Sequence, residues 1–528
     1  MGLPSLFRSQ SVRQASTLLA ITALLSNGLG LMRNLVFYRF IDKGQLDVYF
    51  ASFRIADFIL NLLIIGAVTS AVIPVLSELI ANQKEGEARR VTNQIFSWAS
   101  LAILVLISIL AAIMPWLVSH LFYGFDAARQ LDTVFLSRIL LIQALFFSWS
   151  FIIGALLNGY RRFTSYALAP LVYNIALIVG GVLANQHGVK ILVLLVVVGA
   201  FGHFLIQLVE AWRIGFIPRI DLRLSEEVKT VARLMVPRSL SQGMNQIVLL
   251  VYTSLASGLT AGSIAIFSGM NDLQTTPTVI IANSLATAVF PALATQVASE
   301  KWEEMSHLLT KVIRVSLFLL LPTLVMSLVL RAQIVRLYIG IGHTNWELTD
   351  IAIATFTWFI IGIIPSSLVV ILARVFYATK DTKTPLIITS VSAACGIVLS
   401  IIGIRYFHST VATLAVSETL IASVQCVLYL VILHRRNHLN LSTQLLSHIT
   451  LVSGVGSILL AGATWLTLHA VDYAYTFTPG FGTEKVLGLL VQTFLAAGVG
   501  MLVYFGYSSI RNKEELSWLQ SKVLSRGR

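Results

Sequence analysis

Long runs of apolar residues alternate with short polar segments along the whole chain. Fourteen of these runs are long enough to cross a bilayer, since each transmembrane helix needs about 20 mainly apolar residues. Lys and Arg cluster at the ends of the runs. The pattern therefore predicts an all-α polytopic membrane protein with about fourteen transmembrane helices.

Two short motifs occur twice, at nearly the same separation. SAVIPVLS at 70–77 resembles TAVFPALA at 287–294, and NGYRR at 158–162 resembles YATKD at 377–381. We therefore expect two parallel six-helix repeats around a central cavity, related by an axis along the membrane normal, followed by two further helices. The expected parts are an N-terminal lobe, a C-terminal lobe, two additional transmembrane helices and a basic tail, at 1–217, 218–440, 441–510 and 511–528.

Composition supports a membrane protein and excludes a large soluble domain. Apolar residues make up 56% of the 528 positions and charged residues only 12%, whereas soluble chains carry about 25% charge. The net charge of +13 comes from basic residues in every second loop, without a basic patch that exposes aromatic residues. This distribution indicates membrane topology rather than nucleic-acid binding, and it predicts that both termini are cytoplasmic.

The first two apolar runs contain ionisable residues that membrane insertion disfavours. A charged side chain near the bilayer centre costs about 2.5–3.5 kcal/mol, so each one suggests a functional site. Arg33, Asp47, Arg54 and Asp57 are such residues, and Asn27 adds a polar group. Arg54 and Asp57 lie three residues apart, so they can also pair on one helix face for structural reasons alone.

Further polar residues lie in later runs. Arg238 follows Pro237 in the seventh run, Asp272 lies in the eighth, and Glu418 is a single acid in the twelfth. Asp272 could belong to a cation site or to hydrogen bonds between helices. The sequence has no catalytic, cofactor or metal-binding motif, so it favours a transporter over an enzyme. Arginine suits permanent, bidentate binding of phosphate, and Arg33, Arg54 and Arg238 could hold a lipid pyrophosphate.

Several segments resemble the MurJ (MviN) family of lipid II flippases, within the multidrug and oligosaccharidyl-lipid exporter superfamily. These segments are 154–163 with 169–174, the linker Pro218-Arg219-Ile220-Asp221, and 376–385. The resemblance implies a monomer in the bacterial cytoplasmic membrane, with a cationic cavity and a lipid-facing groove. It also implies movement of lipid II from the inner to the outer leaflet by alternating access, without ATP.

The substrate-binding arginines of that family are only partly present. The first-helix motif of the family falls on Asn27, Gly30, Arg33 and Asn34, which retains one arginine. Asp47 and Arg54 match the second-helix acid and base, whereas the eighth-helix arginine falls on Asp272. Either Arg33, Arg54 and Arg238 rebuild the substrate site, or the cargo is another lipid-linked glycan.

Two other functions remain open from the sequence. One is a cation-coupled drug antiporter of the same superfamily, in which Asp272 and Glu418 would carry the coupling cation. The other is a non-transporting scaffold for cell-wall synthesis. Membrane lipids are expected partners in every case.

Overall fold

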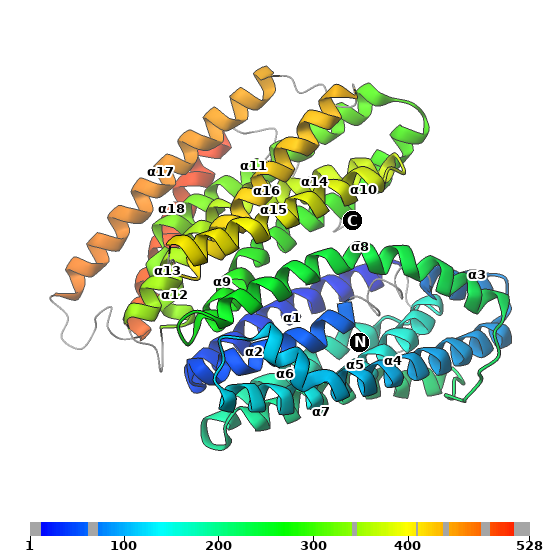
Figure 1. The fold of residues 1–528 in the computed structure, drawn as a ribbon. Helices are drawn as coiled ribbons and strands as arrows, with labels where there is room; N and C mark the ends of the chain where they lie inside the picture. Colours follow the sequence, from blue (N-terminus) through cyan, green and yellow to red (C-terminus); the bar gives the residue numbers. More distant parts are fainter. Residues whose placement is uncertain are drawn as a thin grey trace. The chain divides into compact units, whose positions relative to one another are not determined.

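The computed structural model of the chain is built from α-helices (Figure 1). It describes residues 12–61, 72–340, 346–407, 410–436, 443–476 and 486–511. By their contacts, these residues fall into two compact units, Met1–Ala265 and Ile266–Arg528.

The first unit is a bundle of long helices. In it α6 packs on α7 and α1, and α7 packs on α5. A cluster of buried hydrophobic residues joins α3, α4, α5, α7 and α8. Small residues allow close packing here, since a Cβ added to Gly199 of α7 would lie 2.9 Å from Cβ of Ala176 in α6. The helices are α1 (Val12–Phe40), α2 (Lys43–Ile59), α3 (Ile73–Ala81), α4 (Glu85–Leu121), α5 (Ala127–Gly159), α6 (Thr164–His187), α7 (Val189–Arg213) and α8 (Glu226–Ser257).

The second unit begins within α9 (Ser263–Pro277). In this unit α17 packs on α18 and α11, and α16 packs on α13, α14 and α15. The remaining elements are the π-helix η4 (Thr278–Asn283), α10 (Ser284–Ala298), α11 (Trp302–Val329), α12 (Arg331–Tyr338), α13 (Trp346–Ile361), α14 (Ile363–Ala378), α15 (Lys383–Phe407), α16 (Ala412–Arg435), α17 (Thr443–Tyr475) and α18 (Val486–Arg511).

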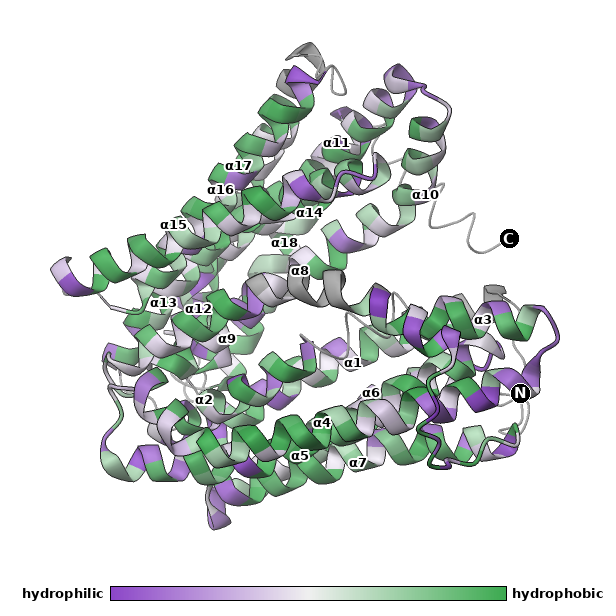
Figure 2. Cartoon of the chain, turned by 45° about the vertical axis from the view of Figure 1, so that its right-hand side comes forward, coloured by the Kyte–Doolittle hydropathy of each residue, from purple (hydrophilic) through white to green (hydrophobic). Residues whose placement is uncertain are grey.

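The helices have the length and composition of membrane spans. Within the described ranges, 12 helices are long and apolar enough to cross a bilayer, and α9, η4 and α10 form one of them. Hydrophobic residues follow α4 and α5 along their length, and hydrophilic residues gather at the turns near α3 (Figure 2). The predicted all-α polytopic membrane fold is therefore confirmed.

The four non-glycine residues with positive φ in the described chain support the repeat. Gln83 and Glu300 have φ of 60° and 56° and lie 217 positions apart; Arg161 and Lys380 have φ of 55° and 60° and lie 219 apart. Each ends a helix in a left-handed turn, and the next residue donates its N–H to a carbonyl five positions earlier. The lysine after each residue of the first pair forms the same ion pair, Lys84–Glu87 at 3.3 Å and Lys301–Glu304 at 2.8 Å.

The division by contacts differs from the lobe boundary expected after residue 217. Helix α8 belongs to the first unit because it packs on α2 and α4. A sequence repeat reflects duplication, whereas contacts reflect which helices pack together, so the two divisions need not coincide. The boundaries at 217, 440 and 510 remain predictions.

Candidate functional site

Arg33 of α1 lies in a hydrogen-bonded network that crosses from α1 to α6. Its Nε donates to Oδ1 of Asn34 at 3.1 Å, and its Nη1 donates to Oδ1 of Asn174 at 3.3 Å. Asn174 in turn donates to Oγ of Ser26 and to the carbonyl of Pro170. Because amides hold the guanidinium without neutralising it, Arg33 keeps a full positive charge within a membrane span.

A second charged group lies on α2. Nη1 of Arg54 is 3.9 Å from Oδ2 of Asp57, and both side chains are mostly buried. Asn61 donates to the other oxygen of Asp57 at 2.8 Å. The pair expected from the spacing is therefore present, and its charges largely offset each other.

Tyr173 of α6 lies within electrostatic range of both charged groups. Its phenol interacts electrostatically with both Arg33 and Asp57. The first unit therefore contains two arginines and one aspartate, from α1 and α2, that act on one tyrosine of α6. Their formal charge is +1. Arg33 is held by two amides and lies over the ring of Phe37, 5.9 Å from its centroid.

Asp47 is buried, and its carboxylate is fully engaged by backbone groups. Oδ2 accepts the N–H of Gly262 at 2.5 Å, and Oδ1 accepts the N–H of Ala265 at 2.8 Å. The first N–H groups of a helix have no partner within it, and Gly262 has no side chain to cap α9. Asp47 therefore acts as the anionic cap of α9 from a distant part of the chain.

Tyr38 strengthens this connection from α1. Its hydroxyl donates to the carbonyl of Ala265 at 2.6 Å, and Lys43 donates to the carbonyl of Tyr38 at 2.8 Å. Both side chains are buried. We call Tyr38, Lys43, Asp47 and the backbone of 262–265 the α9 clasp.

The other residues expected at the site remain predictions. Asn27 is exposed on α1. Arg238 lies in α8, and its side chain is outside the described residues. Asp272 lies in the second unit, six residues before η4, and its carbonyl accepts a hydrogen bond from Thr276 at 2.8 Å.

Sequence reasoning missed Asn174, Tyr173 and Tyr38. Asn174 ends the segment at 169–174, which indicated the family but no role for its amide. In the described part of the chain, no three potential metal ligands lie together. His203, for example, shares a hydrogen bond of 2.7 Å between its Nδ1 and Oγ of Ser150, within the packed α5–α7 interface.

Comparison with known proteins identifies relatives along most of the chain. The family model described as lipid II flippase MurJ matches residues 39–481. A lipid II flippase MurJ from Burkholderia cenocepacia is 28% identical over 377 residues, which cover 69% of this chain and 72% of the relative. A probable lipid II flippase MurJ from Bdellovibrio bacteriovorus is 25% identical and covers 96% of both chains.

Solved structures agree on the fold. A lipid II flippase MurJ in an inward closed conformation has a TM-score of 0.75 at 21% identity, with 95% of this chain and 100% of that chain covered. An inward-facing multidrug resistance MATE family transporter of the MOP superfamily has a TM-score of 0.67 at 15% identity, with 80% and 98% covered. The suspected resemblance is confirmed, and so is the interpretation as a transporter rather than an enzyme: the chain belongs to the MurJ family of lipid II flippases.

Proposed function

We propose that this chain moves lipid II, the lipid-linked peptidoglycan precursor, from the inner to the outer leaflet of the bacterial cytoplasmic membrane. Arg33 carries this proposal, because it is a permanent cation in a membrane span whose charge is left for an anion. Two of the residues that hold it, Asn34 and Asn174, are buried and fix its direction. A guanidinium held in this way suits the pyrophosphate of a polyprenyl-linked glycan.

Arg33 has a matched control on the same helix. Arg39 lies in the last turn of α1 and is exposed. In vesicles that contain the purified protein, Arg33→Gln should abolish most lipid II exposure, and Arg33→Lys should restore part of it. Arg39→Gln removes the same charge and should leave exposure near the parent level. Equal exposure by Arg33→Gln and the parent would refute the role of Arg33.

The same assay separates transport from a scaffold role. A flippase exposes lipid II in vesicles that contain no other protein. A scaffold for cell-wall synthesis would support growth of cells but would not expose lipid II in such vesicles. A different polyprenyl-linked glycan as cargo would give exposure of that glycan but not of lipid II. We expect the chain to function as a monomer with both termini in the cytoplasm.

We infer that alternating access requires the α9 clasp to open and close. The hydrogen bonds of the clasp stabilise the state in which it is closed. The transported lipid must bind the open state more tightly to shift this equilibrium. We therefore assign Asp47 to this conformational step rather than to contact with the substrate.

The driving force for the step can be electrical. Moving one negative charge outward in an inside-negative cell is favourable by about 2.3 kcal/mol per 100 mV. Cation coupling through Asp272 is the alternative. The fold is shared with MATE family transporters, so we also propose a test of cation coupling. If Asp272→Asn removes a dependence of transport on a cation gradient while Arg33→Gln does not, Asp272 carries the coupling ion.

A further inference from the structure

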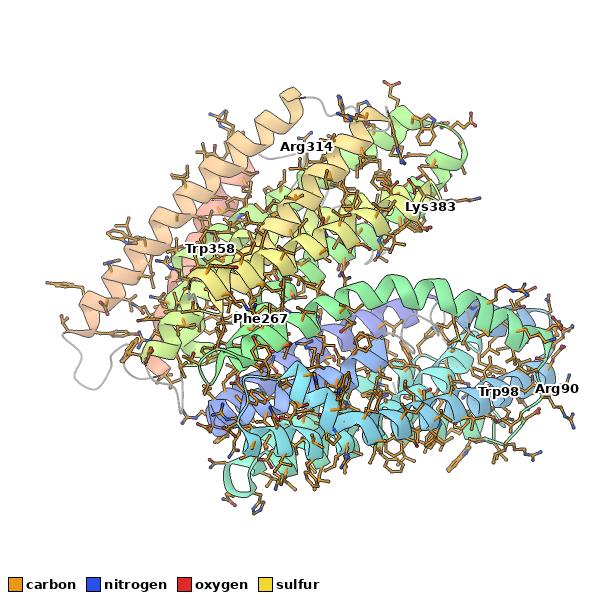
Figure 3. All side chains as sticks on the ribbon, viewed as in Figure 1. Arg90, Trp98, Phe267, Arg314, Trp358 and Lys383 are labelled. Atoms are coloured by element: carbon orange, nitrogen blue, oxygen red, sulfur yellow. The ribbon has the colours of Figure 1, made fainter. Side chains whose placement is uncertain are left out.

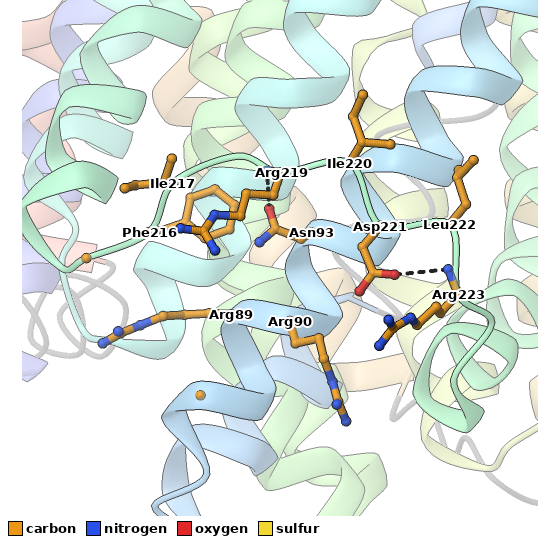
Figure 4. A pocket seen from close by; sticks show the side chains of 12 residues that line it. Arg89, Arg90, Asn93, Phe216, Ile217, Arg219, Ile220, Asp221, Leu222 and Arg223 are labelled. Carbon is orange, nitrogen blue, oxygen red and sulfur yellow. Dashed lines mark hydrogen bonds between the residues drawn. The ribbon is translucent and has the colours of Figure 1, made fainter.

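A basic pocket of about 730 Å³ lies in the first unit, between the start of α4 and the segment that follows α7 (Figure 4). Four arginines and one aspartate line it, so its formal charge is +3. The charged lining residues are Arg89, Arg90, Arg219, Asp221 and Arg223.

The wall of the pocket is built by specific hydrogen bonds. Oδ1 of Asn93 accepts the N–H of Arg219 at 2.9 Å, and Oγ of Ser97 accepts the N–H of Asp221 at 3.0 Å. The carboxylate of Asp221 accepts from Nε2 of Gln94 at 3.2 Å and from the N–H of Arg223 at 3.1 Å. The only acid in the lining therefore serves to fix the segment to α4.

The arginines are only partly compensated by acids. Arg89 pairs with Glu85 at 3.2 Å, and Glu227 interacts with Arg90 over a longer range. Among the described residues, no carboxylate lies within 4.0 Å of a guanidinium nitrogen of Arg90, Arg219 or Arg223. The pocket therefore favours a ligand with negative charge.

Exposed apolar side chains lie on the segment that carries Arg219 and Arg223 and at the end of α7. Ile220, between Arg219 and Asp221, is 90% exposed, and the other exposed members are Trp212, Ile217, Leu222 and Leu224. Trp98, an aromatic residue typical of membrane interfaces, lies two turns beyond Arg90 on α4 (Figure 3). Arginines and apolar side chains on one short segment match a surface that meets both headgroups and acyl chains.

We propose that this pocket binds the phosphate headgroup of an anionic phospholipid, with the acyl chains against the exposed apolar side chains of 212–224. The site lies at the end of the first unit that the charge distribution predicts to be cytoplasmic. The linker between the two expected repeats, which begins at Pro218, forms one wall of this pocket. This lipid is distinct from the transported cargo, so the proposal stands whether or not the cargo is lipid II.

The test is native mass spectrometry of the detergent-purified full chain, titrated with phosphatidylglycerol and, separately, with phosphatidylcholine. We expect preferential retention of phosphatidylglycerol. A triple variant, Arg90→Gln, Arg219→Gln and Arg223→Gln, should lose about a hundredfold in affinity for it, because each basic residue near an anionic surface contributes roughly a factor of five.

The matched control removes three exposed basic residues of the second unit, through Lys301→Gln, Lys383→Gln and Arg435→Gln. It has the same net charge as the pocket variant and should retain phosphatidylglycerol as the parent does. Equal loss in both variants would show a general charge effect and overturn the site. Melting temperatures without lipid establish that both variants fold.

A second arm separates a lipid headgroup from a soluble phosphate. Ile220→Ser with Leu222→Ser should weaken retention of phosphatidylglycerol and leave the four arginines in place. Inorganic pyrophosphate at millimolar concentration should not displace the lipid from the parent chain. If pyrophosphate displaces it, or if the serine variant retains it unchanged, the pocket serves a soluble anion and the lipid proposal is wrong.

Discussion

Replacing Asp47 with asparagine tests the α9 clasp with almost no change in side-chain size. The amide oxygen of asparagine can still accept one of the two N–H groups, from Gly262 or Ala265. The NH₂ group of the amide must then face the other N–H. The change removes one charge-assisted hydrogen bond, worth roughly 1.5–3 kcal/mol, and leaves a buried donor unpaired. We therefore expect the closed clasp to lose about 3 kcal/mol, which is roughly a hundredfold in its equilibrium constant.

Hydrogen exchange measures this loss directly. The amides of Gly262 and Ala265 should exchange roughly a hundredfold faster in Asp47→Asn than in the parent, because exchange reports local opening. Asp126→Asn is the control, since Asp126 caps α5 through the N–H of Arg129 and asparagine caps equally well. Unchanged protection at 262–265 in Asp47→Asn would refute the clasp, and equal loss across the whole chain would indicate general destabilisation instead.

Three further changes test other contacts. Tyr38→Phe removes the hydrogen bond to the Ala265 carbonyl and should speed exchange of 262–265 by only about fivefold, as expected for a loss of about 1 kcal/mol. Gly181→Ala should lower the melting temperature, because its Cβ would lie 2.8 Å from Phe37 of α1. Although desolvation raises the pKa of Asp381, hydrogen bonds from Thr384 and Arg436 lower it to about 2. Its contribution to stability is thus present above pH 4 or so and lost as the pH falls towards 2, and Asp381→Asn should remove that acid-dependent part of thermal unfolding.

The sequence predicted the spans and the Arg54–Asp57 pair because both depend on local patterns. Apolar run length defines a span, and a separation of three residues places two side chains on one helix face. The role of Asp47 was not predictable in this way, since its partners are backbone N–H groups more than 200 positions away. Every residue except proline can supply a backbone N–H, so the sequence carries no mark of that contact. Asn174 was missed for a related reason: an amide acquires its role only once α6 packs on α1.

The two expected repeats share the ends of their helices but not the charged pair of α2. Helix ends, left-handed turns and the lysine–glutamate pairs recur at the repeat offset, because they determine where helices begin and end. The charged pair of α2 does not recur: the positions 217 residues after Arg54 and Asp57 hold Asn271 and Gln274. The position 217 residues after Asp47 holds Ile264. Asp47 accepts the N–H groups of Gly262 and Ala265, on either side of this counterpart. Asp47, near the start of α2, therefore caps the start of α9, which is the counterpart of α2 in the second expected repeat. The charged pair of α2 therefore belongs to the first expected repeat, the same repeat that carries Arg33.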